Sequence, residues 1–126
     1  NGLRVATSEQ AVVDQTVANR IVEFEPGSAV PRPDSTVILD ELASTLKRLG
    51  ERRVEVIGHT DAQGSRSSNV ALSLARAQAV KSYLVNQGLA TERIATSGMG
   101  PDQPVADNST EAGRARNRRI EFRVGA

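Results

Sequence analysis

Residues 58–84, with the sequence GHTDAQGSRSSNVALSLARAQAVKSYL, join a short loop to the longest helical pattern in the chain. Apolar positions that recur at three and four residues predict a helix over 67–87, which Gly88 ends. Its most regular buried stripe is Ser73, Ala77, Val80 and Leu84. The loop follows a β-branched run at 54–58, and loops at the carboxyl ends of strands are where such sheets place ligands. The stretch therefore predicts both a packed helix and a place for a ligand site.

Shorter patterns on both sides supply the rest of the predicted fold. Alternating or β-branched runs predict further strands over 20–24, 93–97 and 119–124, and apolar spacing predicts a helix over 34–49. A helical turn is expected near 110–116. The order is β-α-β-α-β-(turn)-β, which predicts an α/β (α+β) fold with helices packed on a mixed sheet.

The chain of 126 residues is most simply one domain, expected over 20–126, preceded by an extension over 1–19 of uncertain structure. In the extension, 3–5 is open between a strand and a tail, and 9–19 is expected to be helical. Because the chain starts with Asn1, we interpret it as a soluble fragment of a longer protein, with any membrane attachment in a segment absent here.

The composition argues against several classes of protein. Sixteen basic and fifteen acidic side chains give a net charge of +1, so the overall charge gives no support for nucleic-acid binding. The three aromatic side chains, Phe24, Tyr83 and Phe122, are too few for base stacking. The absence of cysteine excludes disulfides and cysteine-based metal sites. The glycines lack the spacing of a phosphate-binding loop, so neither a nucleotide nor another cofactor is expected.

Polar side chains of the 58–84 stretch predict a ligand site without a catalytic centre. Asp61 lies in the loop, and Asn69, Leu72 and Arg76 follow on one stripe of the helix. A guanidinium fits a carboxylate, and a carboxylate with nearby carbonyl groups fits an ammonium, so Asp61 and Arg76 together would hold an α-amino acid terminus. The alternatives are that Asp61 caps its own loop and that Arg76 is solvated or paired with Asp61.

Two other features are open between a structural and a functional interpretation. His59, the only histidine, has no partner at metal-ligand spacing and no evident nucleophile, which favours a structural role at a strand end. A basic cluster is either a solvated loop and strand edge or a site that attracts an anionic group. Its members are Arg114, Arg116, Arg118 and Arg119.

The helix pattern Asn69-x-x-Leu72-Ser73-x-x-Arg76-Ala77-x-x-Val80-x-x-x-Leu84 resembles the signature of the OmpA-like domain. This is the peptidoglycan-binding module of outer-membrane protein A, peptidoglycan-associated lipoprotein and flagellar stator proteins. The resemblance covers about residues 20–124. Its other parts are 24–29 (FEPGSA), 58–61 (GHTD), 98–100 (GMG), Pro104 and 117–121 (NRRIE).

The resemblance implies a β-α-β-α-β-β arrangement in which helices pack on a mixed four-stranded sheet. It also implies non-covalent binding of the peptide stem of peptidoglycan through its diaminopimelate residue. The implied contacts, principal ones first, are Asp61, Arg76, Asn69, Leu72, Arg119, and Thr60 and Ala62 mainly through their backbone.

We therefore expect a non-enzymatic domain that anchors the cell envelope to the cell wall from the periplasm, with envelope proteins as further partners. One alternative is a protein-interaction module of an envelope, secretion or stator complex. The other is a cell-wall hydrolase that acts through Asp61 with Glu25 or His59, which would need two acids facing each other across a cleft.

Overall fold

The computed structural model describes residues 2–16 and 22–125, and it places side chains from residue 9 onward. Within these ranges the chain forms four α-helices, one 3-10 turn and three β-strands. In chain order they are α1 (Gly2–Thr16), α2 (Pro33–Arg48), β1 (Val54–His59), α3 (Arg66–Asn86), η1 (Thr91–Arg93), β2 (Ile94–Gly100), α4 (Glu111–Asn117) and β3 (Arg119–Val124).

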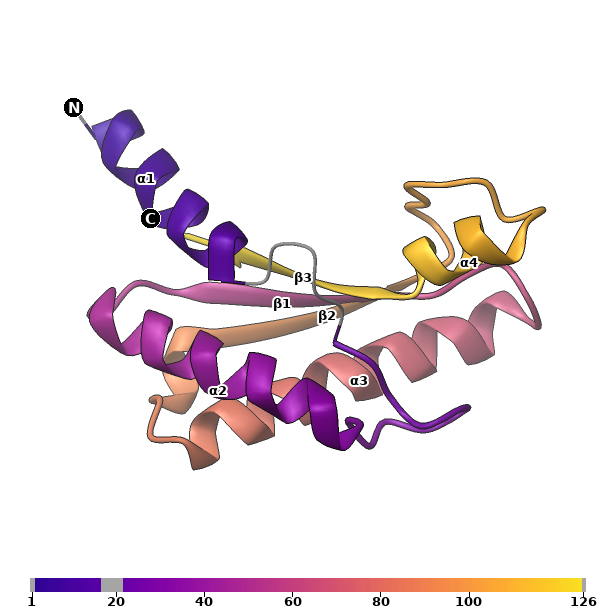
Figure 1. The fold of residues 1–126 in the computed structure, drawn as a ribbon, viewed down its shortest axis with the longest axis horizontal. Coiled ribbons are helices and arrows are strands. Elements are labelled where there is room, and N and C mark those ends of the chain that lie inside the picture. The colour runs from indigo at the N-terminus through magenta and orange to yellow at the C-terminus, as the bar shows by residue number, and fades with distance from the viewer. Residues whose placement is uncertain (1, 17–21, 126) are drawn as a thin grey trace.

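Strand β1 is the centre of a mixed sheet with the order β2-β1-β3. It pairs in parallel with β2, where Val54 faces Ile94, and antiparallel with β3, where Val54 faces Val124. Helix α3 connects the two parallel strands, and α2 and α3 lie side by side on one face of the sheet (Figure 1). This arrangement brings the end of β1, the start of α3 and the start of β3 to the same end of the molecule.

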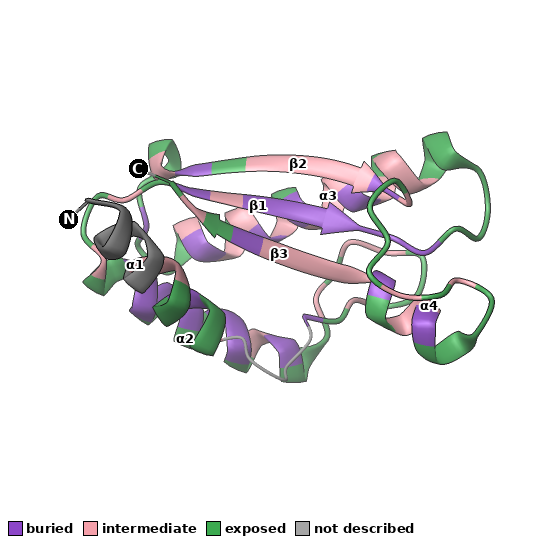
Figure 2. Cartoon of the chain, turned by 90° about the horizontal axis from the view of Figure 1, so that it is seen from above, coloured by how far each residue is buried: buried purple, intermediate pink, exposed green. Residues whose placement is uncertain are grey.

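The core lies between this sheet and the helices α2 and α3, and Figure 2 shows buried stretches, in purple, along both helices and the central strand β1. It is aliphatic apart from Phe122. Its largest fully buried apolar side chains on the two helices are Leu39, Leu42, Leu46, Val80 and Leu84. The buried residues of α3 are Ser73, Ala77, Val80 and Leu84, which confirms the stripe predicted from the spacing.

Helix α3 approaches the sheet closely because glycines face it. A Cβ atom on Gly58 would lie 2.1 Å from the carbonyl oxygen of Ser73, and one on Gly98 would lie 2.4 Å from the backbone nitrogen of Leu74. Any side chain at either glycine would therefore push the helix away from the strands.

A buried hydroxyl fixes this contact further. Ser73 Oγ accepts a hydrogen bond from the backbone N–H of Gly100 at 2.9 Å and donates one to the carbonyl oxygen of Val70 at 2.9 Å. The end of β2 is thereby bonded to the middle of α3, and the position of α3 on the sheet determines where Arg76 lies.

Helix α1 packs against α2 and β3. Its Val13 side chain is fully buried. The Gln10 carboxamide donates to the carbonyl oxygen of Phe122 at 2.8 Å and accepts from the N–H of Val124 at 2.7 Å. These are the backbone groups that a neighbouring strand would use, so α1 covers part of the outer edge of β3.

The prediction of a fourth strand over 20–24 is wrong for the residues that the structure describes. Residues 20 and 21 lie outside the described ranges, and 22–24 contain only an isolated bridge between Phe24 and Pro31. The backbone here bonds to itself around a turn, since the N–H of Glu25 donates to the carbonyl oxygen of Val30 at 3.0 Å. The described part of the sheet therefore has three strands, not four.

The N-terminal helix also differs from the prediction over 9–19. It begins at Gly2 and ends at Thr16, so 3–5 is helical, and 17–19 lies outside the described residues. No helix in the described part of the chain is long and apolar enough to cross a membrane.

Candidate ligand-binding site

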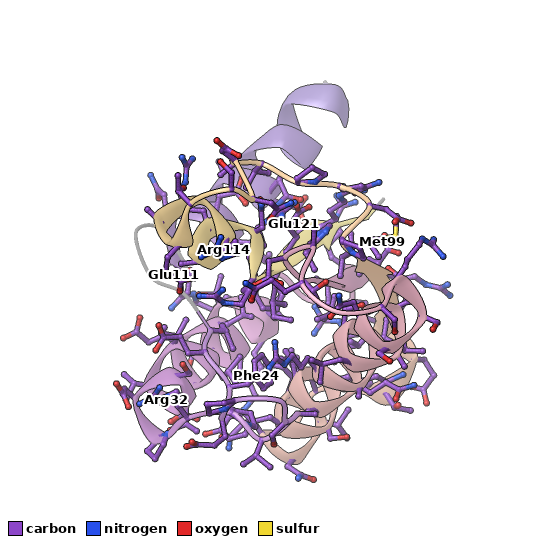
Figure 3. The ribbon with its side chains drawn as sticks, turned by 90° about the vertical axis from the view of Figure 1, so that its right-hand side faces the viewer. Phe24, Arg32, Met99, Glu111, Arg114 and Glu121 are labelled. Atoms are coloured by element: carbon purple, nitrogen blue, oxygen red, sulfur yellow. The ribbon has the colours of Figure 1, made fainter. Side chains whose placement is uncertain are left out.

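A cavity of about 490 Å³ opens at the end of the sheet where β1 stops and β3 starts. Figure 3 shows this end, with Phe24 and Arg32 on the side of α2 and Glu111 across from them on α4. The volume is in the range typical of small-molecule sites. The residues that line it are Val22, Glu23, Phe24, Pro26, Gly27, Arg32, His59, Asp61, Gln63, Arg76, Glu111, Ala115, Arg118, Arg119 and Ile120.

Asp61 is held in place by the loop that leaves β1. The N–H of Thr60 donates to the carbonyl oxygen of Gly100 at 2.9 Å, and the Thr60 hydroxyl donates to the carbonyl oxygen of Asp61 at 2.8 Å. The Asp61 side chain is only 10% exposed. Its Oδ1 accepts from the N–H of Gln63 at 3.0 Å, and its Oδ2 accepts from Nη1 of Arg118 at 2.8 Å. Both oxygens of this buried carboxylate therefore have a donor.

Arg118 is a site residue that sequence reasoning missed. Its Nη1 contacts Asp61, and its Nη2 donates to Oε2 of Glu111 at 2.9 Å. These hydrogen bonds, the one to Glu111 first, raise the pKa of Arg118 above its usual value, and the bond from Arg118 lowers the pKa of Glu111. The basic cluster was the signal in the sequence that could have identified Arg118. A buried acid such as Asp61 needs a cationic or N–H partner, and this cluster supplies one.

Arg76 reaches the same cavity from the middle of α3. Its Nε donates to the carbonyl oxygen of Ser28 at 2.9 Å, and its guanidinium carbon lies 5.0 Å from the centroid of the Phe24 ring, a cation–π distance. Burial lowers the pKa of Arg76, the charge of Arg118 lowers it further, and Asp61 opposes the shift. The terminal nitrogens of Arg76 have no hydrogen-bond partner among the described residues.

Arg119 and His59 form the wall of the cavity next to β3. Nη2 of Arg119 donates to Oε1 of Glu121 at 2.7 Å and to the carbonyl oxygen of Gln103 at 3.0 Å. The ring of His59 is 1% exposed, and its Nε2 lies 3.2 Å from Glu121 Oε1 without hydrogen-bond alignment. Burial lowers the pKa of His59 and the charge of Arg119 adds to this, so the ring is neutral at pH 7.

A rigid corner positions Arg118 and Arg119. The buried side chain of Asn117 hydrogen-bonds the backbone of residues 105 and 106, accepting from both N–H groups and donating to the carbonyl oxygen of residue 106. A Cβ atom on Gly113 would lie 1.7 Å from the carbonyl oxygen of Asp107, so α4 touches this loop backbone to backbone.

The remaining predicted contacts do not line the cavity. Asn69 Nδ2 donates to the carbonyl oxygen of Gln63 at 2.7 Å, which holds the loop of Asp61 from α3. Thr60 is buried, Ala62 is exposed and Leu72 is half-buried. In this structure Asn69 and Thr60 support the loop, and direct contacts from these four residues stay predictions.

The cavity combines both signs of charge. Four arginines and three acids line it: Arg32, Arg76, Arg118 and Arg119 with Glu23, Asp61 and Glu111. In the part of the chain that the structure describes, no three His, Cys, Asp or Glu side chains lie together as metal ligands would. Glu25, which a hydrolase mechanism would pair with Asp61, is not among the lining residues. Fixed charges of opposite sign suit a zwitterionic ligand.

Comparison with known proteins decides the family. The model of the OmpA family matches residues 23–118. The chain belongs to the OmpA family. The matched range contains Asp61, Arg76 and Arg118, whereas α1 precedes it.

Relatives of known name agree with this assignment. The peptidoglycan-associated lipoprotein from Burkholderia pseudomallei matches with a TM-score of 0.79 at 30% identity, covering 87% of this chain and 93% of that one. Probable lipoprotein YiaD of Escherichia coli is 43% identical over 80% of this chain and 46% of its own length. Peptidoglycan-binding protein ArfA of Mycobacterium tuberculosis is 45% identical over 73% of this chain and 28% of its own length. The chain thus spans less than half of these last two relatives.

Proposed function

We propose that this OmpA-family domain binds peptidoglycan non-covalently, through the diaminopimelate residue of its stem peptide. The observation that carries the proposal is the cavity that Asp61 and Arg76 line together, which brings a carboxylate and a guanidinium to one ligand space. Two relatives support it by name, the peptidoglycan-associated lipoprotein and the peptidoglycan-binding protein ArfA. The domain would act in the periplasm, and a membrane attachment elsewhere in the full-length protein would make it an anchor between envelope and wall.

The free end of diaminopimelate in a stem peptide carries a carboxylate and an ammonium on one carbon. Ser28 and Phe24 orient the guanidinium of Arg76, and its two terminal NH₂ groups would donate hydrogen bonds to the carboxylate. The positive charge of Arg118 nearby strengthens the attraction for that anion. Asp61, fixed by the N–H of Gln63, receives the ammonium. This is recognition by charge pairing in a partly desolvated site, without a bond-breaking step.

Co-sedimentation with purified sacculi tests the proposal. The variants Asp61→Asn and Arg76→Ala each remove one charged partner, so each should bind at least about tenfold more weakly, because a lost charge-assisted hydrogen bond costs about 1.5–3 kcal/mol. Arg116→Ala is the matched control, since Arg116 is an exposed arginine on α4 that does not line the cavity. Circular dichroism should show the parent fold in all three. Parent-like binding by both cavity variants would refute the site.

The hydrolase alternative is separated by its product. We expect no soluble fragments when the domain is incubated with peptidoglycan, because Asp61 is the only buried acid among the described residues, and a hydrolase would need a second acid facing it across the cleft. Released muropeptides above a boiled-protein control, which disappear in Asp61→Asn, would show that the domain is an enzyme.

A further inference from the structure

One guanidinium in this cavity is shared between two acids from different segments. Nη1 of Arg118 lies 2.8 Å from Asp61, which is in the loop after β1, and Nη2 lies 2.9 Å from Glu111, which is in the first turn of α4. The two acids differ in setting, since the Asp61 side chain is 10% exposed and the Glu111 side chain is 67% exposed. Both line the cavity.

This arrangement conflicts with a ligand ammonium at Asp61. Oδ1 of Asp61 already accepts from the N–H of Gln63, and Oδ2 already accepts from Arg118. A second cation at Oδ2 would meet Arg118 at contact distance, where two like charges repel by about 1–4 kcal/mol in a partly solvated site. An ammonium therefore binds Asp61 more strongly once Arg118 has left Oδ2.

We propose that Arg118 is a movable guanidinium with two positions and that Glu111 is the positioning residue that receives it when a ligand ammonium takes its place at Asp61. The inference rests on the proposed function. The required motion is small, because Arg118 already touches Glu111 and needs only to turn its side chain to replace one bond to each acid by two bonds to Glu111. A guanidinium and a carboxylate form such a two-bond pair readily.

Glu111 then determines which ligands the cavity prefers. With Glu111 present, Arg118 has an alternative partner, and Asp61 becomes available to an ammonium. Without Glu111, Arg118 stays with Asp61 and the cavity loses one negative charge. Without Glu111, the cavity should therefore no longer bind a dicarboxylate that lacks an ammonium less well than one that carries it. The competing interpretation is that Glu111 only supports α4, since it also accepts from Nε of Arg114 at 3.2 Å.

Two small probes separate these roles. One is meso-diaminopimelate, and the other is pimelate, which has the same seven-carbon dicarboxylate chain without amines. Glu111→Gln should weaken diaminopimelate binding about two- to fivefold, the size expected for an exposed charge pair, and should not weaken pimelate binding. Glu92→Gln is the matched control because Glu92 is an exposed acid that does not line the cavity. Affinities come from nuclear magnetic resonance titration, and thermal unfolding checks that each variant is folded.

A double-mutant cycle shows whether Glu111 acts through Arg118. In an Arg118→Gln background, Glu111→Gln should no longer change diaminopimelate affinity. The proposal is overturned if Glu111→Gln leaves both affinities unchanged, weakens both probes equally, or keeps its full effect without Arg118. If the parent binds neither diaminopimelate nor sacculi, the proposed function fails as well. Parent binding with an unaffected Glu111→Gln refutes only the role of Glu111.

Discussion

The face of α3 that packs on the sheet and the side of α3 that lines the cavity are built in opposite ways. On the sheet face, Ser73 and Ala77 are fully buried, and the glycines of β1 and β2 meet the helix backbone directly. On the cavity side, Arg76 is half-buried and makes one hydrogen bond, from its Nε to the carbonyl oxygen of Ser28. The sheet face of α3 therefore leaves no room for a larger side chain, whereas on the cavity side the terminal nitrogens of Arg76 have no hydrogen-bond partner among the described residues.

The difference indicates how one short helical pattern can serve both structure and binding. Ser73 and Arg76 are three residues apart, yet one determines the distance between α3 and β2 and the other faces the ligand space. Substitutions on the sheet face should therefore change stability, and substitutions on the cavity side should change binding. The cavity-side half of this comparison is tested by Arg76→Ala and Asp61→Asn on sacculi.

The largest effect on the sheet face is expected from Gly58→Ala. The new Cβ atom would lie 2.1 Å from the backbone carbonyl oxygen of Ser73, so β1 and α3 must separate, and the free energy of unfolding should fall by about 3 kcal/mol. Urea denaturation followed by circular dichroism measures it. Gly125→Ala is the control, since a Cβ there would be 3.6 Å from its nearest neighbour. Equal stability of the two variants would contradict the close packing.

A smaller effect on the same face is expected from Ser73→Ala. The substitution leaves the buried N–H of Gly100 without its acceptor, so the free energy of unfolding should fall by about 1–3 kcal/mol. Sacculus binding by the folded variant should match the parent, since Ser73 does not line the cavity. Ser82→Ala, at an exposed position of α3, should change neither property. A loss of sacculus binding without a loss of stability would show that Ser73 contributes to the ligand site and not to the packing of α3 on the sheet.

The smallest effect concerns His59, which is buried in the sheet and also lines the cavity. Burial, with Arg119 next, holds its pKa below the usual 6.5, while Glu121 opposes the shift. The unfolded chain therefore binds this proton more readily, and the stability due to His59 is present above pH 6.5 and is lost as the pH falls from there toward the pKa of the folded state. Urea unfolding at about pH 7 and about pH 5 should show a larger loss for the parent than for His59→Gln, and equal losses would contradict the shift.

The periodic parts of the fold could be predicted from the sequence. Strand β3 was expected at its observed bounds, and α2, β1 and α3 lie within two residues of expectation at each end. These elements bury one face, so their spacing carries the information. The run at 22–24 misled because its β-branched composition suits a strand, whereas Pro26 and Gly27 turn its backbone onto 30–32.

The site was only partly predictable. Asp61 lies in the loop that leads into α3, and Arg76 lies on α3 itself. Their proximity in the sequence predicted a shared site, and the structure places both at one cavity. The partner of Asp61 is Arg118, which is 57 residues away, and the ring under Arg76 is Phe24. Such pairings depend on tertiary contacts between loops of different strands, and neither helical nor strand periodicity records them.

The most direct test of the central claim is a titration of the ¹⁵N-labelled domain with meso-diaminopimelate. If Asp61 and Arg76 hold one zwitterion in the shared cavity, the largest shifts will fall on the amides of Asp61 and Gln63 and on the Nε–H of Arg76, while the amides of α1 stay in place. Saturable shifts that avoid these groups and gather elsewhere, in a domain that still binds sacculi, would contradict the account.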